Sequence, residues 1–445
     1  MGRTGAASEM TAAVSDLSSY VNTARATRRL QEMVRIPAVA GEERPMAEYV
    51  AAALRDLECA TVYVDEHWNV LGIVGDARGA SLMFLTHTDS APAGGMQDPY
   101  SATIMAGDRF GKSGPVVYGR GACAPKAALA AMLEAVAALR DCGIRLAGSL
   151  LVAAVTKDLR ANHDGIKELA ASYPLGADVV VGGEPSDNHV VLGARGIAHF
   201  EVRFQGRPAH WSRPSEAVNP LYGLADLLAA LERLSLPSHG ALGPATVSPF
   251  EVRSDATPPR SPHTAAVMLD RRMLPGESVD AVRGEFQRVV DGITAARPGL
   301  TGEVMYVRGT YPFAVPDDAP TVTLLQRAAQ AALGRALPTT YIPFSSNAGY
   351  AIGEMNIDGA AFGPGRIADV NETEHVEIDR VVEAAAVYAA AAALAVGNGR
   401  GCRTGRHGRD RASAALPSRP VRAPGAARRG AGLRPRVGAG RALLS

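Results

Sequence analysis

The feature that most constrains this chain is a regular alternation of short apolar segments with longer amphipathic or alanine-rich ones. The apolar run at 149–155, for example, follows an alanine-rich segment of helix length at 126–140. Repeated β, α, β units of this kind form a mainly parallel sheet with helices on its faces, so the sequence predicts an α/β fold. The expected strands are 60–64, 70–74, 81–85, 149–155 and 177–181, and the expected helices before residue 193 are 24–34, 46–57 and 126–140.

The pattern changes near Gly193 and changes back near residue 310. Between these points the expected order is strand, helix, strand, strand, helix, strand, at 199–204, 221–234, 245–252, 265–270, 279–293 and 302–307. This β-α-β-β-α-β order is that of the ferredoxin-like split unit. We predict an α/β domain at 25–192 and 310–398, interrupted by an inserted α+β ferredoxin-like domain at 193–309.

The C-terminal segment has a different composition from the rest of the chain. Residues 399–445 consist mainly of Arg, Gly, Ala and Pro. From 400 to 445 there are 12 Arg and one acidic residue, so this segment carries +11 and leaves −10 for the remainder of a chain whose net charge is +1. A segment with so little apolar surface cannot offset its ordering entropy, so we predict a disordered tail. The acidic remainder argues against nucleic-acid binding by the folded part.

Composition also bears on the compartment. No run of 18 or more apolar residues occurs, so we expect no membrane span. Residues 1–17 lack the apolar core of a signal peptide. The four cysteines are widely separated and form neither a disulfide framework nor a zinc knuckle. We therefore expect a cytoplasmic protein without a membrane partner.

Two of the predicted strands end in groups that can bind a metal or transfer a proton. Thr86-His87-Thr88-Asp89 follows the strand at 81–85, and Gly183-Glu184-Pro185 follows the strand at 177–181. Ligands of open parallel sheets bind beyond the carboxyl ends of the strands. A histidine with a carboxylate two residues later suits a metal ligand and its orienting partner. The plain alternatives are a structural histidine and a glutamate in a turn.

These motifs occur in an order that resembles one known family. The chain is similar, over residues 25–398, to the zinc aminoacylase/exopeptidase family of acetylornithine deacetylase, succinyl-diaminopimelate desuccinylase and the glutamate carboxypeptidases. The motifs that carry the resemblance are Val34-Arg35-Ile36-Pro37, His87-Thr88-Asp89, Tyr118-Gly119-Arg120-Gly121, Gly183-Glu184-Pro185, Pro208-Ala209-His210, Asp270-Arg271-Arg272 and Gly363-Pro364-Gly365.

The resemblance implies an α/β domain with an inserted lid that forms a homodimer. It implies a small amino-acid-like substrate whose amide bond is hydrolysed at two zinc ions that share a bridging aspartate and a water. His87 and Glu184 match ligands of one zinc. Asp89, Asp158 and His210 are the candidate catalytic residues, the last matching a lid histidine that reaches across the dimer to the developing oxyanion.

Several positions depart from the family pattern. Ala124 stands where the bridging aspartate is expected, and Val370 (or its neighbours Asp369 or Asn371) stands where the last histidine ligand is expected. The family also has two consecutive acidic residues, a general base followed by a zinc ligand. These positions correspond here either to Asp158 and Leu159 or to Leu159 and Arg160, and in both registers the ligand is lost. Side chains of alanine, leucine and valine cannot bind a divalent metal. We therefore expect a two-ligand remnant that holds one zinc or other divalent ion, or none.

Neighbouring residues offer possible substitutes. Cys123, beside the bridging position, is either a nucleophile or soft ligand, or a small buried turn residue. His163 and Asp164 are expected on a surface loop, and Arg120 and Lys126 are expected to support the fold.

Three functions are compatible with this pattern. The first is an enzyme that keeps the substrate pocket but no longer hydrolyses by ordinary two-zinc chemistry, and instead carries out amide formation, acyl transfer or cyclisation. The second is an active metal-dependent N-acyl-amino-acid deacylase or dipeptidase with a rebuilt site. The third is a non-catalytic homologue that binds an amino-acid-like ligand.

Overall fold

The computed structural model describes residues 14, 16–75 and 79–397, and all of them belong to one compact unit. The predicted disordered tail at 399–445 lies outside the described residues, as does most of the segment 1–17 that we examined for a signal peptide.

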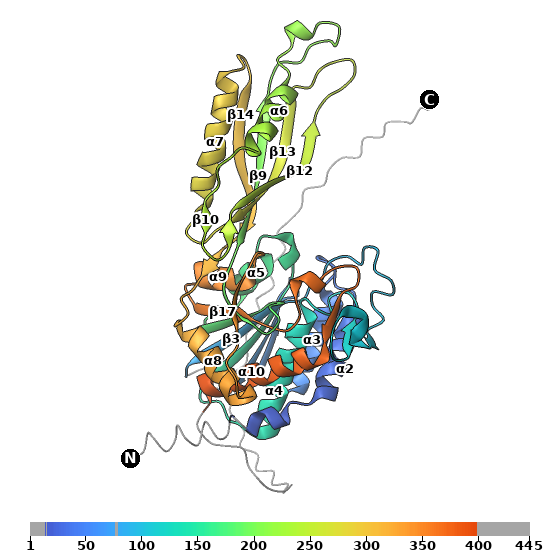
Figure 1. Cartoon of the computed structure of the whole chain (residues 1–445), viewed down its shortest axis with the longest axis vertical. Helices are drawn as coiled ribbons and strands as arrows, with labels where there is room; N and C mark the ends of the chain where they lie inside the picture. Colours follow the sequence, from blue (N-terminus) through green and yellow to red (C-terminus); the bar gives the residue numbers. More distant parts are fainter. Residues whose placement is uncertain (1–13, 15, 76–78, 398–445) are drawn as a thin grey trace, which may run out of the picture. The chain divides into compact units, whose positions relative to one another are not determined.

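A nine-stranded sheet forms the centre of the α/β part (Figure 1). In spatial order it contains β1 (Thr61–Val64), β2 (Val70–Gly75), β6 (Ser149–Val155), β3 (Ser81–His87), β7 (Val179–Gly183), β17 (Asp358–Phe362), β8 (Val190–Ala194) and β15 (Phe313–Ala314), with β16 (Thr339–Ile342) beside β8. The central strands β6, β3, β7 and β17 run parallel, whereas β1, β2 and β15 pair antiparallel at the two sides. This sheet confirms the predicted α/β class.

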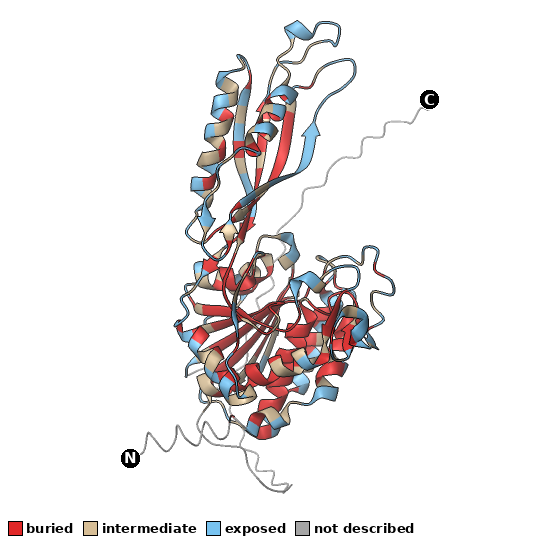
Figure 2. Ribbon diagram, viewed as in Figure 1, coloured by how far each residue is buried: buried red, intermediate tan, exposed pale blue. Residues whose placement is uncertain are grey.

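Alternate side chains of the central strands enter two different hydrophobic clusters, one on each face of the sheet, as the two-residue period of a strand requires. Leu82 and Phe84 join the cluster formed with α2 (Thr23–Val34), α3 (Arg44–Asp56), α4 (Lys126–Cys142), α8 (Pro320–Leu333) and α10 (Ile378–Val396). Met83 and Leu85 join the cluster formed with α5 (Asp164–Ser172) and α9 (Asn347–Gly353). Burial on both faces explains why these strands read as continuous apolar runs (Figure 2).

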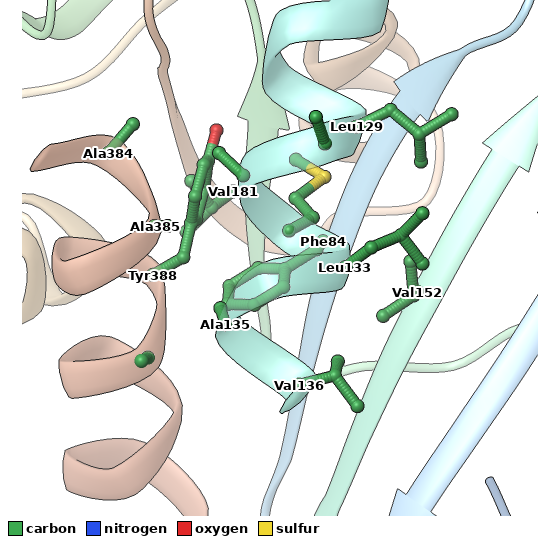
Figure 3. Close-up of a cluster of buried hydrophobic side chains, with 14 of the residues drawn as sticks. Phe84, Leu129, Leu133, Ala135, Val136, Val152, Val181, Ala384, Ala385 and Tyr388 are labelled. Carbon is green, nitrogen blue, oxygen red and sulfur yellow. The ribbon is translucent and has the colours of Figure 1, made fainter. Parts of the chain in front are cut away.

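The first cluster is centred on two alanine-rich helices, α4 and α10, that lie side by side (Figure 1). Small side chains let these helices approach, and the aromatic rings of Phe84 and Tyr388 fill the space between them and the sheet (Figure 3). The two rings meet edge to face, with centroids 4.9 Å apart. The Tyr388 hydroxyl donates a hydrogen bond to the Phe362 carbonyl oxygen, so the one polar atom at this position is satisfied.

Replacement of Phe84 by alanine is expected to lower the free energy of unfolding by about 3–5 kcal/mol, because the ring is fully buried and its neighbours close only part of the cavity. Urea unfolding followed by circular dichroism measures this loss. Ile104→Ala, at an exposed position, is the matched control and should change stability by no more than about 0.5 kcal/mol. Equal effects of the two substitutions would contradict the assigned core.

The inserted segment forms a separate four-stranded antiparallel sheet of order β12-β13-β9-β14. Its elements are β9 (Gly196–Gln205), α6 (Pro220–Leu231), β12 (Thr246–Ser254), β13 (Thr264–Met273), α7 (Val279–Ala295) and β14 (Thr301–Thr310). Two helices pack on one face over their own core, which includes Phe200, Phe204 and Phe286. The β-α-β-β-α-β order agrees with the sequence pattern. The limits 193–309 as a separate domain stay a prediction, because the described residues form one unit.

Short elements complete the described chain. They are the sheet of β4 (Thr103–Met105), β5 (Val116–Tyr118) and β18 (His375–Glu377), the pair β10 (Ser238–His239) and β11 (Gly243–Pro244), and the 3₁₀ turns η1 (Ser18–Tyr20), η2 (Gly107–Phe110), η3 (Asp158–Arg160), η4 (Pro214–Glu216) and η5 (Ile367–Asp369). Within the described ranges, no helix has both the length and the apolar character needed to cross a membrane.

Candidate active site

Three ionisable side chains lie at the carboxyl ends of three neighbouring parallel strands. His87 is the last residue of β3, Asp158 lies in η3 just after β6, and Glu184 directly follows β7. Because β6, β3 and β7 are adjacent in the sheet, their ends meet at one edge. The three side chains line one cavity of about 260 Å³.

Asp89 holds the histidine and the turn after β6 in place. Its carboxylate lies 3.1 Å from Nδ1 of His87 and accepts hydrogen bonds from the backbone N–H groups of Asp158 and Leu159, at 3.1 and 2.9 Å. Burial opposes ionisation of Asp89, but these donors keep its pKa below the ordinary value. Asp89 is fully buried, so it orients His87 and the turn rather than facing the cavity.

The charge of His87 depends on the carboxyl groups around it. Burial alone would lower its pKa, but the charge of Asp158 and the hydrogen bond to Asp89 outweigh burial and raise the pKa to about 9. Nε2 of His87 lies 3.9 Å from Oδ2 of Asp158. The imidazolium and the carboxylate therefore face each other inside the cavity.

Asp158 and Glu184 are two carboxyl groups in one poorly hydrated space. Burial raises the pKa of Asp158 to about 6, with His87 opposing and Asp89 adding to the shift. Burial, opposed by His87 and reinforced by Asp158, raises the pKa of Glu184 to about 8. Carboxyl groups with pKa values on either side of neutrality can serve as a proton acceptor and a proton donor.

Two consecutive residues at the start of α9 contact these carboxyl groups from behind. The Ser346 hydroxyl offers a hydrogen bond to Glu184, and the Asn347 amide faces Asp158 and favours its charged form. The sequence pattern left this loop without a role.

Apolar side chains also line the cavity. They include Ala124, Leu159 and Val370, three of the four positions where metal ligands were expected, together with Ile367. Arg160 does not line the cavity, and its guanidinium lies against Gly41. Of the two possible registers for the lost acidic pair, we propose the one with Asp158 and Leu159, because both residues line the cavity. Two lid residues, Ile197 and Arg272, also line the cavity, contacts that the sequence did not predict.

Cys123 does not face the cavity. Its side chain is buried, and its thiol donates to the Arg366 carbonyl oxygen at 3.1 Å. Burial holds the pKa of this thiol well above its usual range, so the reactive thiolate is disfavoured. This placement supports the interpretation of Cys123 as a buried turn residue over that of a nucleophile or ligand.

The remaining predicted residues fall in several places. His210 is exposed in the lid, where Nδ1 contacts the Ser212 hydroxyl, and it does not line the cavity of its own chain. Arg120 pairs with Glu374 at 2.9 Å. Lys126 donates to the Ile36 carbonyl oxygen, so Arg120 and Lys126 support the fold as expected.

The prediction for His163 is wrong. The sequence placed it on a surface loop, but its side chain is fully buried and accepts a hydrogen bond from the backbone N–H of Tyr311. A polar local sequence hides this burial because the covering residues come from a distant part of the chain.

Comparison with known proteins identifies the family. The sequence profile of the peptidase family M20/M25/M40 matches residues 83–394. The chain belongs to this family. It is 26% identical over 386 residues to the uncharacterized protein YgeY of Escherichia coli K12, covering 82% of this chain and 93% of that protein. It is 29% identical over 298 residues to succinyl-diaminopimelate desuccinylase of Phenylobacterium zucineum, covering 61% and 75% of the two chains.

Solved structures show the same fold. A tripeptidase from Staphylococcus aureus superposes with a TM-score of 0.69 at 19% identity, covering 84% of this chain and 99% of that one. The YXEP protein of Bacillus subtilis, described as a dinuclear metal-binding M20 peptidase, superposes with a TM-score of 0.58 at 16% identity, covering 84% and 98%. These agreements confirm the resemblance to the family and its α/β fold with a separate antiparallel sheet.

The residues of this chain do not fit the dinuclear metal site of the family. Of the expected ligands, only His87 and Glu184 line the cavity, and the other positions carry Ala124, Leu159 and Val370. In the part of the chain that the structure describes, no group of three or more His, Cys, Asp or Glu side chains has the geometry of a metal site. Aliphatic side chains contribute no ligand atoms, so a second metal position is not supplied.

Proposed function

We propose that this M20-family chain acts on an amide of a small amino-acid-like substrate by amide formation, acyl transfer or cyclisation, and not by ordinary two-zinc hydrolysis. One observation carries the proposal. The cavity is lined by His87, Asp158 and Glu184 but has Ala124 and Leu159 where the family resemblance implies metal ligands. A bridging hydroxide is then not available, so an amine can compete with water as the nucleophile.

The residues present can support such a reaction. The amine nitrogen of one substrate attacks the acyl carbon of the other, and Asp158 accepts the proton that the nitrogen loses. The tetrahedral intermediate then expels the leaving group, which takes a proton from Glu184. His87, held by Asp89, keeps Asp158 oriented and balances its charge in the poorly hydrated cavity.

A second candidate is a deacylase or dipeptidase with a rebuilt mononuclear site. It is favoured by the placement of His87 and Glu184, the two retained ligand positions, in one cavity, where they would hold a single divalent ion that polarises the substrate carbonyl. Zinc content and reaction direction distinguish the two candidates.

The test combines metal analysis with assays in both directions. The purified protein is reconstituted with zinc, dialysed and analysed by mass spectrometry, then incubated with N-acetyl-amino acids for hydrolysis and with amino-acid thioesters plus free amino acids for amide formation. We expect less than one zinc per chain and amide product that is lost in Asp158→Asn but kept in Cys123→Ala. Two zincs per chain with hydrolysis on the order of 10 per second would overturn the proposal.

We also propose a homodimer formed through the lid. Within the described residues the edge strand β12 pairs with β13 alone, and its residues Phe250 and Val252 are 51% and 55% exposed. Long exposed edges with apolar residues pair with another chain unless they are protected. A partner could also bring its His210 to the cavity, which the resemblance implies.

Sedimentation velocity at micromolar concentration should therefore show a dimer. Val252→Lys should weaken dimerisation by at least about tenfold, because it places a charge in the apolar edge contact. Ile104→Lys, at an exposed position outside the lid, is the control and should leave the dimer intact. A monomeric unmodified protein would rule the dimer out.

A further inference from the structure

A buried polar path runs behind the cavity and ends at the segment that leaves the lid. His163 is fully buried, and Asn347 is 2% exposed. Nε2 of His163 lies 3.1 Å from the backbone nitrogen of Tyr311, and Nδ1 lies 3.3 Å from Oδ1 of Asn347. Neither residue belongs to the motifs that identify the family.

The donor and acceptor of each hydrogen bond along this path follow from the chemistry of the groups. A backbone N–H can only donate, so Nε2 of His163 accepts from Tyr311 and carries no proton. The proton of the neutral imidazole is then on Nδ1, which donates to Oδ1 of Asn347. Oδ1 is thereby fixed as the acceptor, and the Asn347 amide group must turn Nδ2 the other way.

Nδ2 of Asn347 is buried. It finds no hydrogen-bond partner of ordinary geometry among the described residues, yet the amide lies near enough to Asp158 to favour the charged carboxylate. A buried amide donor without a partner carries a desolvation cost of about 1–3 kcal/mol, so such a group is retained where it meets an acceptor during function.

The other end of the path is anchored where the lid joins the α/β part. Tyr311 directly follows β14, the last lid strand. Two residues earlier, the Gly309 N–H donates a hydrogen bond to Oδ1 of Asn162 at 3.4 Å. The backbone of Tyr311 packs so closely on Gly349 of α9 that a Cβ there would lie 2.2 Å from the Tyr311 carbonyl oxygen. The turn after Asp158, helix α9 and the lid connection therefore form one packed junction.

We propose that His163 and Asn347 are positioning residues that set the orientation of the Asp158 carboxylate and tie it to the lid connection at Tyr311. The backbone N–H of Tyr311 fixes the tautomer of His163, the imidazole fixes the amide of Asn347, and the amide fixes Asp158. A shift of the lid connection is thereby passed to the group that accepts the proton. The inference rests on the proposed function, in which Asp158 acts in the cavity.

Two substitutions at His163 separate the halves of the path. His163→Gln can keep an acceptor for Tyr311 but loses the donor to Asn347. His163→Asn can keep a donor to Asn347 but loses the acceptor for Tyr311. Asn347→Leu removes the last link with little change of volume. Tyr350→Phe is the control, because its ring packs on His163 at a centroid distance of 5.8 Å while its hydroxyl lies off the path.

The first readouts need no enzymatic activity. In ¹⁵N NMR spectra of the full chain, His163 should be protonated on Nδ1 alone. The Tyr311 amide should exchange with solvent at least about tenfold faster in His163→Asn than in Tyr350→Phe. The ¹³C carboxyl resonance of Asp158 should move in Asn347→Leu and His163→Gln and stay in the control. Protonation on Nε2, or an unmoved Asp158 resonance in Asn347→Leu, would overturn the inference.

The kinetic readout separates this inference from the proposed function. If the amide-forming reaction is found, kcat should fall about 10- to 100-fold in Asn347→Leu and His163→Gln with KM nearly unchanged, and His163→Asn should retain most of kcat. Unchanged kcat in Asn347→Leu would refute the positioning role while leaving the proposed function intact. Absence of any reaction with the NMR results as expected would refute the proposed function and leave the path intact.

Discussion

Zinc bound per chain is expected to rise toward the two ions of a dinuclear site when Ala124→Asp, Leu159→Glu and Val370→His are combined. The three side chains line the same cavity as His87 and Glu184, so the new carboxylates and imidazole would share a cavity with the two retained ligand positions. The aspartate, glutamate and histidine would add three side chains of the kinds that bind zinc. Mass spectrometric metal analysis after zinc reconstitution and dialysis measures the result.

Arg160 supplies a matched control for this prediction. Arg160→Glu in place of Leu159→Glu should fail to raise zinc binding, because the side chain at 160 lies against Gly41 and not in the cavity. His87→Ala in the restored background should reduce binding again. If the variant carrying Arg160→Glu binds two zincs and the variant carrying Leu159→Glu does not, the assigned register of the turn after β6 is wrong.

The fold could be predicted because its signals are local and repeated. Burial of β3 and β6 on both faces produces apolar runs such as 149–155, and the half-buried lid strands alternate, so the two sheets leave different patterns. The limits of the short strands could not be predicted in the same way. Strand β5 has three residues, and its pairing with His375 joins parts of the chain far apart in sequence.

The site residues at the ends of strands could be predicted from the sequence, but the buried residues that contact them could not. His87 and Glu184 follow apolar runs directly, and adjacency of parallel strands brings them together. His163 carries no such signal. Its partners Tyr311 and Asn347 are 148 and 184 residues away, and a histidine in a polar loop is indistinguishable by sequence from an exposed one.

His163 is expected to make the unmodified protein lose stability in acid more steeply than its His163→Gln variant. Burial lowers the pKa of His163 to about 3 in the folded state, whereas an unfolded histidine titrates near 6.5. Below about pH 6.5 the unfolded state therefore binds a proton that the folded state does not, and the free energy of unfolding falls as pH falls, until about pH 3. Above pH 6.5 both states are neutral at His163, and its contribution is constant.

The magnitude follows from the same two pKa values. Between pH 7 and pH 4.5 the unmodified protein should lose about 2.5 kcal/mol more than His163→Gln, at a rate approaching 1.4 kcal/mol per pH unit. The variant starts lower at pH 7, because it loses the bond to Asn347, so the comparison is of slopes and not of absolute stabilities. Tyr350→Phe keeps His163 buried and should follow the slope of the unmodified protein. Urea unfolding at several pH values measures the free energy of unfolding of all three proteins. Parallel curves for the unmodified protein and His163→Gln would contradict the prediction, because they would show that His163 is accessible to protons in the folded state. The hydrogen bond from the Tyr311 N–H to Nε2 does not permit such access.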